Sequence, residues 1–272
     1  MKNFFKLTLL GIITLWFFGM SEVKVSAASN SNTFENKENG IITVTYNNTT
    51  NVKMKIGVTK DKQSYYYDLG HGKSKLDIPL NMGNGKYTIR ILKNISGTKY
   101  SVVETTSIDL DLSDDNIVFL QSNVIVNFEL SDKAIEKAKD LTQKCKSDAE
   151  IVSTIHNYVV KNFEYDYDKA STVSSGYLPD IEIIYKNKKG ICYDISAIMA
   201  AMMRSQGVEV KLVTGYTPNI KGVYHAWNSV YDDSSGSWYT IDATYDIAMY
   251  RAKKKYTMKK DSKDYSDTKY QY

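Results

Sequence analysis

Residues 190–207 read GICYDISAIMAAMMRSQG and predict a buried helix with a cysteine in its first turn. Apolar side chains recur at helical spacing, and Gly207 is typical of a helix C-terminus. Cys192 would therefore face unpaired backbone N–H groups and the positive end of the helix dipole, which favour the reactive thiolate. The same N–H groups could donate to a developing oxyanion, and Gly190 would let a substrate backbone come close. The apolar face consists of Ile195, Ile198, Met199, Met202 and Met203.

Three strands are predicted after this helix, and two of them carry polar side chains that can assist a thiol. Residues 208–216 are rich in β-branched side chains, residues 224–231 carry His225, and residues 238–244 carry Asp242. A histidine near the cysteine can take the thiol proton, and an aspartate on the adjacent strand can fix the histidine tautomer. The order and element type of the cysteine, histidine and aspartate thus predict a catalytic triad.

Each of these side chains also has an ordinary structural explanation. A cysteine in a methionine-rich helix is usually core, a histidine beside a tryptophan usually packs, and an aspartate at a strand end is usually a cap or turn residue. The occurrence of all three in this order is better explained by a shared catalytic role. A further alternative joins Cys192 to Cys145 in a disulfide, which is the default for exported cysteines. Because Cys145 has polar neighbours at a helix end, we expect it to be a free, non-catalytic thiol.

Three short motifs, Gly190–Asp194, Tyr224–Trp227 and Ile241–Thr244, resemble the transglutaminase-like superfamily, a circularly rearranged relative of papain-type thiol proteases. The resemblance covers roughly residues 131–250. It implies an α+β core in which a cysteine-bearing helix packs on an antiparallel sheet. The nucleophile, base and acid of the family then fall on Cys192, His225 and Asp242. Contacts with the substrate are expected from Gly190, Tyr193, Tyr224 and Trp227.

The sequence departs from the animal enzymes of this family at two points. They carry tryptophan directly after the cysteine, where this chain has Tyr193, and they need calcium. Asp109–Ser113 lacks the glycine and the terminal glutamate of an EF-hand loop. We therefore expect acyl transfer or hydrolysis at peptide or glutamine carboxamides through a thioester, with peptidase, amidase and cross-linking outcomes all open. The alternative is a catalytically inactive cell-surface or cell-wall binding protein that kept the fold.

The first half of the chain has the periodicity of strands. Apolar and polar side chains alternate in short runs separated by turn residues, which is typical of a small Ig-like β-sandwich. We expect this domain over residues 40–128 and the catalytic domain over 130–272, because the periodicity becomes helical near residue 131. Ser147–Glu150 forms a capping-box pattern at a helix start, and His156 on that helix is expected at the surface or in packing. The alternating runs include residues 42–46, 52–58, 76–80, 87–91 and 124–126.

The N-terminal residues 1–27 have the pattern of a secretory signal peptide. Lys2 and Lys6 precede an apolar run, and small residues precede Ala28. The run is shorter than the roughly 20 residues of a spanning helix, which favours cleavage over a retained anchor. Residues 28–39 are polar and are predicted to be a flexible linker. The layout looks like exported Gram-positive proteins with a β-rich N-terminal domain, so we expect a secreted or extracellular protein without an integral membrane segment.

The charge of the chain argues against nucleic acid as a partner. The whole chain carries +4 and residues 1–27 carry +2, so the mature chain carries only +2. Basic residues cluster at 251–260, which fits a solvated surface or weak adhesion to an anionic cell wall. The three histidines form no spaced pair, and CxxC, phosphate-loop and dinucleotide motifs are missing. We therefore expect no metal, no cofactor and a monomer. The expected substrate is a protein or peptide, and its location on a cell surface stays open.

Overall fold

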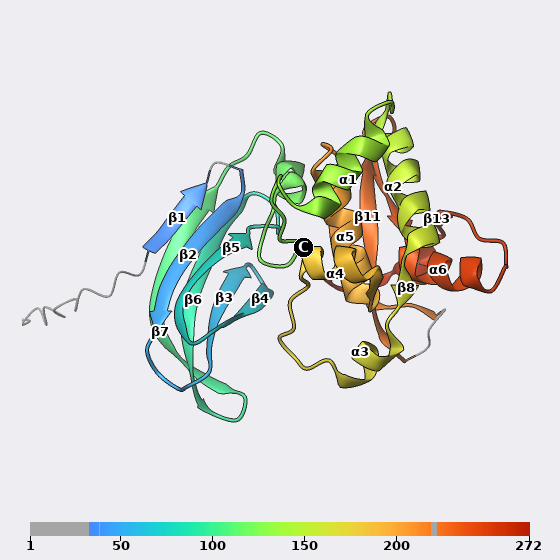
Figure 1. The fold of residues 1–272 in the computed structure, drawn as a ribbon. Helices are drawn as coiled ribbons and strands as arrows, with labels where there is room; N and C mark the ends of the chain where they lie inside the picture. Colours follow the sequence, from blue (N-terminus) through green and yellow to red (C-terminus); the bar gives the residue numbers. More distant parts are fainter. Residues whose placement is uncertain (1–32, 38, 219–221) are drawn as a thin grey trace, which may run out of the picture. The chain divides into compact units, whose positions relative to one another are not determined.

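The computed structural model describes residues 33–37, 39–218 and 222–272 (Figure 1). The predicted α+β class is confirmed, with a β-rich N-terminal part followed by a mixed helical and sheet part. Within the described ranges, no helix is both long enough and apolar enough to cross a membrane.

The N-terminal predictions meet the structure only in part. The predicted signal peptide, residues 1–27, and the first five residues of the predicted linker lie outside the described residues. Thr33–Lys37 is a strand, β1, rather than a flexible linker, and it pairs antiparallel with the following strand. Its sequence TFENK has little apolar pattern, because backbone hydrogen bonds to the neighbouring strand, not burial, hold it in place.

The β-rich part consists of two antiparallel sheets, ordered β1-β2-β5 and β4-β3-β6-β7. The predicted strands are confirmed where apolar side chains alternate, as in β6, whose Tyr87, Ile89 and Ile91 are fully buried. Strands β4 and β7 were not predicted from the sequence, and β7 buries only its last residue, Leu110, so it lacks a buried apolar face. The bounds are β1 Thr33–Lys37, β2 Ile41–Asn48, β3 Met54–Lys60, β4 Gln63–Leu69, β5 Gly72–Pro79, β6 Gly85–Ser96 and β7 Lys99–Leu110.

The strand expected at residues 124–126 is not present. A 3-10 helix, Asp115–Leu120, precedes this segment, which is irregular. The side chain of Asn123 accepts hydrogen bonds from the backbone N–H groups of Ile125 and Val126, at 2.9 and 3.0 Å. This local turn takes the donors that a sheet would use, and the two apolar side chains are buried by packing instead.

Helix α5 is the centre of the C-terminal part. All of its residues from Asp194 to Arg204 are buried, and it packs against β10, β11 and four other helices. The predicted cap of α2 is confirmed, because Ser147 Oγ accepts from the Glu150 N–H at 3.3 Å. The helix bounds are α1 Lys133–Thr142, α2 Asp148–Asn162, α3 Tyr167–Thr172, α4 Ile181–Asn187, α5 Cys192–Arg204 and α6 Ala243–Arg251.

The sheet behind α5 has the order β13-β12-β11-β10-β14 and is antiparallel throughout. The three strands predicted after the cysteine-bearing helix are confirmed as β10, β11 and β12. The third is shorter than predicted, because it ends at Ile241 and α6 begins two residues later. The bounds are β8 Glu164–Tyr165, β9 Lys189–Gly190, β10 Val210–Tyr216, β11 Tyr224–Asp232, β12 Ser237–Ile241, β13 Lys259–Lys260 and β14 Asp267–Gln271.

The two parts share no sheet, but they touch along β14. The backbone N–H of Gln271 donates to Tyr65 Oη at 3.2 Å, and its carbonyl accepts from Asn81 Nδ2 at 2.5 Å. The ring of Tyr272 meets that of Tyr65 edge-on at 5.5 Å. Strand β4 therefore lies against the C-terminal strand of the helical part. The division into two domains near residue 130 stays a prediction.

Candidate active site

Cys192 is the first residue of α5. The preceding Ile191 is the N-cap, in extended conformation, and its carbonyl accepts the Ile195 N–H at 2.9 Å. Cys192 is half-buried, free, and lines a pocket. Its thiol thus sits at the positive end of a helix, as the sequence indicates. Cys145 is also free, with its sulfur 3.6 Å from Thr154 Oγ1, so the disulfide alternative is wrong.

His225 on β11 lies between Cys192 and Asp242. Its Nε2 is 2.8 Å from Asp242 Oδ2, and Cys192 is near enough for its side chain to act on the pKa of the imidazole. Burial lowers the pKa of His225, but the hydrogen bonds and charges of these two partners outweigh burial and raise that pKa to about 10. The imidazole is therefore held in its protonated form at neutral pH, which is the form that pairs with a thiolate.

Asp242 is the N-cap of α6. The sequence pattern predicted Asp242 on the strand that ends before this helix. Its Oδ1 accepts the Tyr245 N–H at 2.9 Å, while Oδ2 accepts from His225 and from the Tyr265 hydroxyl at 2.9 Å. The side chain is only 1% exposed, so these three donors are what make a buried carboxylate tolerable. The cap explanation and the triad explanation of Asp242 are therefore compatible, because each uses a different oxygen.

Trp227 was expected to contact the substrate, but it lies behind His225 and does not line the pocket. It is 2% exposed, its ring stacks on the imidazole at 6.2 Å between centroids, and it meets Tyr265 edge-on at 5.2 Å. His225 and Trp227 are two residues apart on β11 and therefore share one face of the sheet, and Trp227 is buried there with Val213 and Tyr265. The structure thus gives Trp227 a supporting position behind the histidine.

Gly190 was also expected to contact the substrate, but the structure explains the glycine at this position in another way. It is buried and does not line the pocket. A Cβ at Gly190 would lie 2.6 Å from the Cβ of Asp194, closer than real Cβ contacts. The glycine therefore makes room for a buried aspartate at the base of α5. The two tyrosines of the predicted substrate set, Tyr193 and Tyr224, do line the pocket.

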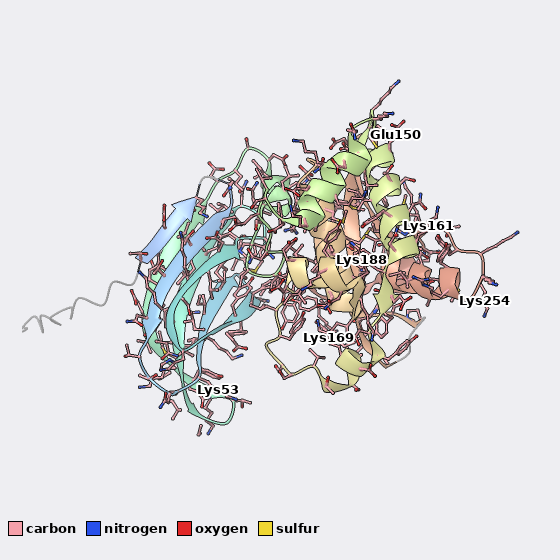
Figure 2. The ribbon with its side chains drawn as sticks, viewed as in Figure 1. Lys53, Glu150, Lys161, Lys169, Lys188 and Lys254 are labelled. Carbon is pink, nitrogen blue, oxygen red and sulfur yellow. The ribbon has the colours of Figure 1, made fainter. Side chains whose placement is uncertain are left out.

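Asp194 is a site residue that the sequence interpretation missed. Its carboxylate is fully buried and accepts from the Ile191 N–H at 3.0 Å, from Lys169 Nζ at 2.6 Å and from Tyr177 Oη at 2.7 Å. Lys169, which Figure 2 labels beside α3, also lies over the Tyr177 ring. The signal was an acidic residue in the first turn of an otherwise apolar buried helix. Asp194 ties the segment after α3 to the start of the cysteine helix.

A second buried histidine–aspartate pair lies about one turn further along α6. His156 Nε2 is 2.9 Å from Asp246 Oδ2, and Lys260 Nζ donates to Asp246 Oδ1. His156 is 1% exposed, so the surface explanation offered for it was wrong and the packing explanation holds. The pair connects α2, α6 and β13. Neither residue lines the pocket at Cys192.

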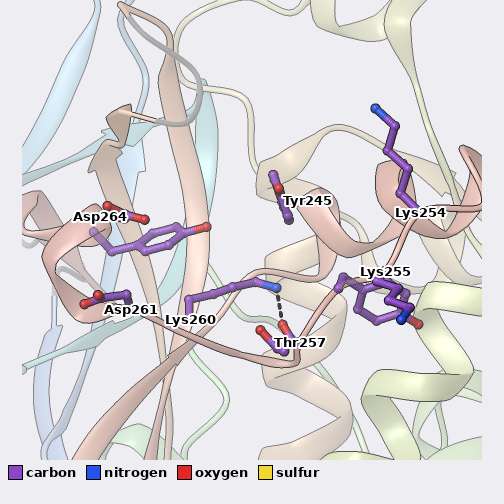
Figure 3. A pocket seen from close by; sticks show the side chains of 9 residues that line it. Tyr245, Lys254, Lys255, Thr257, Lys260, Asp261 and Asp264 are labelled. Atoms are coloured by element: carbon purple, nitrogen blue, oxygen red, sulfur yellow. Dashed lines mark hydrogen bonds between the residues drawn. The ribbon is translucent and has the colours of Figure 1, made fainter.

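A separate open pocket of about 680 Å³ lies next to this pair (Figure 3). Lys260 donates to the Thr257 carbonyl, and in Figure 3 Asp261 and Asp264 lie on one side of the pocket and Lys254 and Lys255 on the other. Within the described residues no group of three His, Cys, Asp or Glu side chains is placed to hold a metal ion.

Residues 135–243 match the family model of the transglutaminase-like superfamily. These residues are a transglutaminase-like domain. The matched range contains the cysteine, the histidine and the aspartate described above. Over 98 residues the chain is 31% identical to UPF0252 protein MJ1282 of Methanocaldococcus jannaschii, a match that covers 33% of this chain. The chain spans only 26% of the length of that curated relative.

The solved structures that are similar to this chain match it with TM-scores below 0.5. A TGase is 27% identical with a TM-score of 0.33, covering 41% of this chain and 30% of its own. A candidate cysteine protease from Cytophaga hutchinsonii is 18% identical with a TM-score of 0.43, covering 85% and 80%. The periplasmic domain of TgpA from Pseudomonas aeruginosa is 14% identical with a TM-score of 0.39, covering 82% and 78%. No chemistry is carried over from them.

Proposed function

We propose that this protein is a thiol enzyme that transfers the acyl group of a peptide or glutamine carboxamide. Cys192 is the nucleophile, His225 the acid–base group and Asp242 the orienting acid. The observation that carries the proposal is the position of His225, which lines the same pocket as Cys192 and lies 2.8 Å from Asp242. A nucleophile, a base and a group that orients the base are the parts that such chemistry requires.

In the first half of the reaction the Cys192 thiolate attacks the carbonyl carbon, and the C=O electrons move to the oxygen. Backbone N–H groups in the first turn of α5 are available to this oxyanion. When the tetrahedral intermediate collapses, the C–N bond breaks and His225 gives its proton to the leaving amine. A thioester on Cys192 remains.

In the second half water or a primary amine attacks the thioester carbonyl and gives a proton to His225. The C–S bond then breaks, the thiolate returns, and the product is an acid or a new amide. Throughout, Asp242 holds the imidazole through one oxygen while α6 and Tyr265 hold the carboxylate. Hydrolysis would make the protein a peptidase or amidase, and amine attack would make it a cross-linking enzyme.

The test uses one preparation in two assays. A glutamine-rich protein is incubated with a fluorescent primary amine, and a peptide set is followed for hydrolysis by mass spectrometry, each with Cys192→Ala as the control. Amine incorporation or hydrolysis that the control lacks supports the proposal. It also distinguishes a cross-linking enzyme from a peptidase or amidase. If both assays stay blank and Cys192 is alkylated no faster than free cysteine, the catalytically inactive binding protein takes its place.

We further propose that the protein acts outside the cytoplasm on a protein or peptide substrate. The support is the charged, then apolar, then small-residue pattern of residues 1–27. N-terminal sequencing of the protein from culture supernatant should give a chain that starts near Ala28. A chain recovered from the cytosol with Met1 at its start would contradict export.

A further inference from the structure

The pocket in front of Cys192 has an unusual lining. It holds about 650 Å³, within the roughly 300–1,000 Å³ typical of ligand sites. Eight of its lining residues are tyrosines, and the only lining side chains that carry a charge are His225 and Asp68. A nucleophile at the edge of an aromatic, nearly uncharged cavity indicates that the neighbouring part of the substrate is apolar.

Large apolar side chains are exposed around this cavity. Tyr66 is 56% exposed, Val223 53% and Leu178 42%, and all three line the pocket. Single exposed apolar residues are ordinary, but a contiguous group beside polar neighbours marks an interaction site. These side chains come from three separate segments of the chain, so the fold brings them together at the cysteine.

One wall of the pocket comes from the β-rich part. Tyr66 and Asp68 lie on β4, which is the edge strand of its sheet. An edge strand presents backbone N–H and C=O groups to an extended peptide, which can add to it as a further strand. These groups and the aromatic side chains together match an extended peptide better than an isolated small molecule.

The segment that follows α3 also lines the pocket. Gly176 lies so close to β4 that a Cβ there would be 2.5 Å from Asp68 Oδ2. The neighbouring Tyr177 is held by its hydrogen bond to the buried Asp194. The segment after α3 is therefore fixed at Gly176 by its contact with β4 and at Tyr177 by its hydrogen bond to the start of α5.

We propose that this pocket binds an extended peptide segment with an aromatic or large aliphatic side chain next to the reacting carboxamide, and that β4 of the β-rich part is one wall of the subsite. The inference rests on the proposed function, because it takes Cys192 as the reacting group. An acidic side chain at the same position would lose its hydration in an aromatic cavity and lie near Asp68, so it is disfavoured.

The experiment measures binding without chemistry. Fluorescein-labelled glutamine peptides with Phe, Leu or Glu beside the glutamine are titrated against full-length Cys192→Ala by anisotropy. The Phe and Leu peptides should bind at least about tenfold more tightly than the Glu peptide, as expected for burial of one apolar side chain. Tyr66→Ala and Leu178→Ser, each added to Cys192→Ala, should reduce that ratio to about threefold or less.

Tyr250→Ala is the matched control, since Tyr250 is 39% exposed on α6 and does not line this pocket. It should leave the ratio unchanged. Equal binding of all three peptides, or loss of preference in the control as much as in Tyr66→Ala, would overturn the subsite. The proposed chemistry is judged separately, by alkylation of Cys192 in the native chain. Slow alkylation together with a clear peptide preference would reject the enzyme and keep the subsite.

Discussion

The carboxylate of Asp242 joins His225 to the start of α6. Its Oδ2 is 2.8 Å from His225 Nε2, and its Oδ1 is 2.9 Å from the Tyr245 backbone nitrogen. One side chain therefore caps a helix and orients an imidazole at the same time. Because the cap fixes the carboxylate, the histidine is held by secondary structure as well as by a hydrogen bond.

Replacing this aspartate should separate its two roles. Asparagine is as good an N-cap as aspartate, so Asp242→Asn should keep α6. The unfolding temperature should fall, because the variant loses the negative charge that stabilises the protonated His225. The amide no longer fixes the tautomer, and turnover should fall by up to about 10⁴-fold, as in serine-protease triads. Asp114→Asn, at the N-cap of the 3-10 helix, is the control and should keep full turnover. Native turnover in Asp242→Asn would remove Asp242 from the proposed mechanism.

The two cysteines provide an internal comparison of reactivity. At neutral pH iodoacetamide should modify Cys192 faster than Cys145, because only Cys192 has a helix N-terminus and a histidine beside it. Mass spectrometry of the two tryptic peptides gives both rates in one sample. His225→Ala should slow the reaction at Cys192 alone, and Cys145→Ser should leave turnover intact. Equal rates at the two thiols in the native chain would count against the proposed nucleophile.

The buried histidine should also make stability depend on pH. The pKa of His225 is about 10 in the folded chain, above its ordinary value of about 6.5, so protonation stabilises the folded state. This contribution is complete below about pH 6.5 and is lost as the pH rises through about 10. The difference in unfolding free energy between the native chain and His225→Gln should therefore shrink over that window.

The same measurement in a Cys192→Ala background serves as the control for the pH effect. The hydrogen bond and charge of Cys192 are among the causes that raise the pKa of His225, so the window should end at a lower pH without them. Urea titrations at a series of pH values give both curves. A difference that stays constant across the window would show that His225 is not charged in the folded state.

Asp194 should act as a positioning residue. Asp194→Asn keeps the size of the side chain but removes the charge that Lys169 and Tyr177 bind. We expect KM to rise more than kcat falls, because the affected segment lines the pocket while the triad stays in place. Lys169→Met should have the same effect in milder form. A merely structural role would lower stability without changing KM, so thermal unfolding is measured alongside the kinetics.

Gly190 should tolerate no side chain. In Gly190→Ala the new Cβ meets Asp194 at 2.6 Å, so the helix start or the aspartate must move, at a cost of about 1–3 kcal/mol. Gly70→Ala is the matched control, because its Cβ would meet nothing closer than 3.8 Å. Denaturant unfolding measures both variants. Equal stability of the two would show that the space beside Asp194 is larger than the structure indicates.

Local patterns were enough to predict much of the fold. The apolar face and the terminal glycine of residues 190–207 predict α5, and alternation predicts strands such as β6 and β11. They failed where an element owes its existence to neighbours. Strand β1 is held by backbone hydrogen bonds to β2, and β7 has no buried apolar face. Residues 124–126 form a turn because the Asn123 side chain accepts hydrogen bonds from their backbone.

The order of Cys192, His225 and Asp242 along the chain was readable from the sequence, because residue type and strand or helix context are local properties. What only the tertiary structure decided is which neighbours these residues have. Tyr265 holds Asp242 and packs against Trp227, and Asp194 anchors a pocket wall through Tyr177. Such contacts join segments far apart in sequence, and no local periodicity records the packing that brings them together.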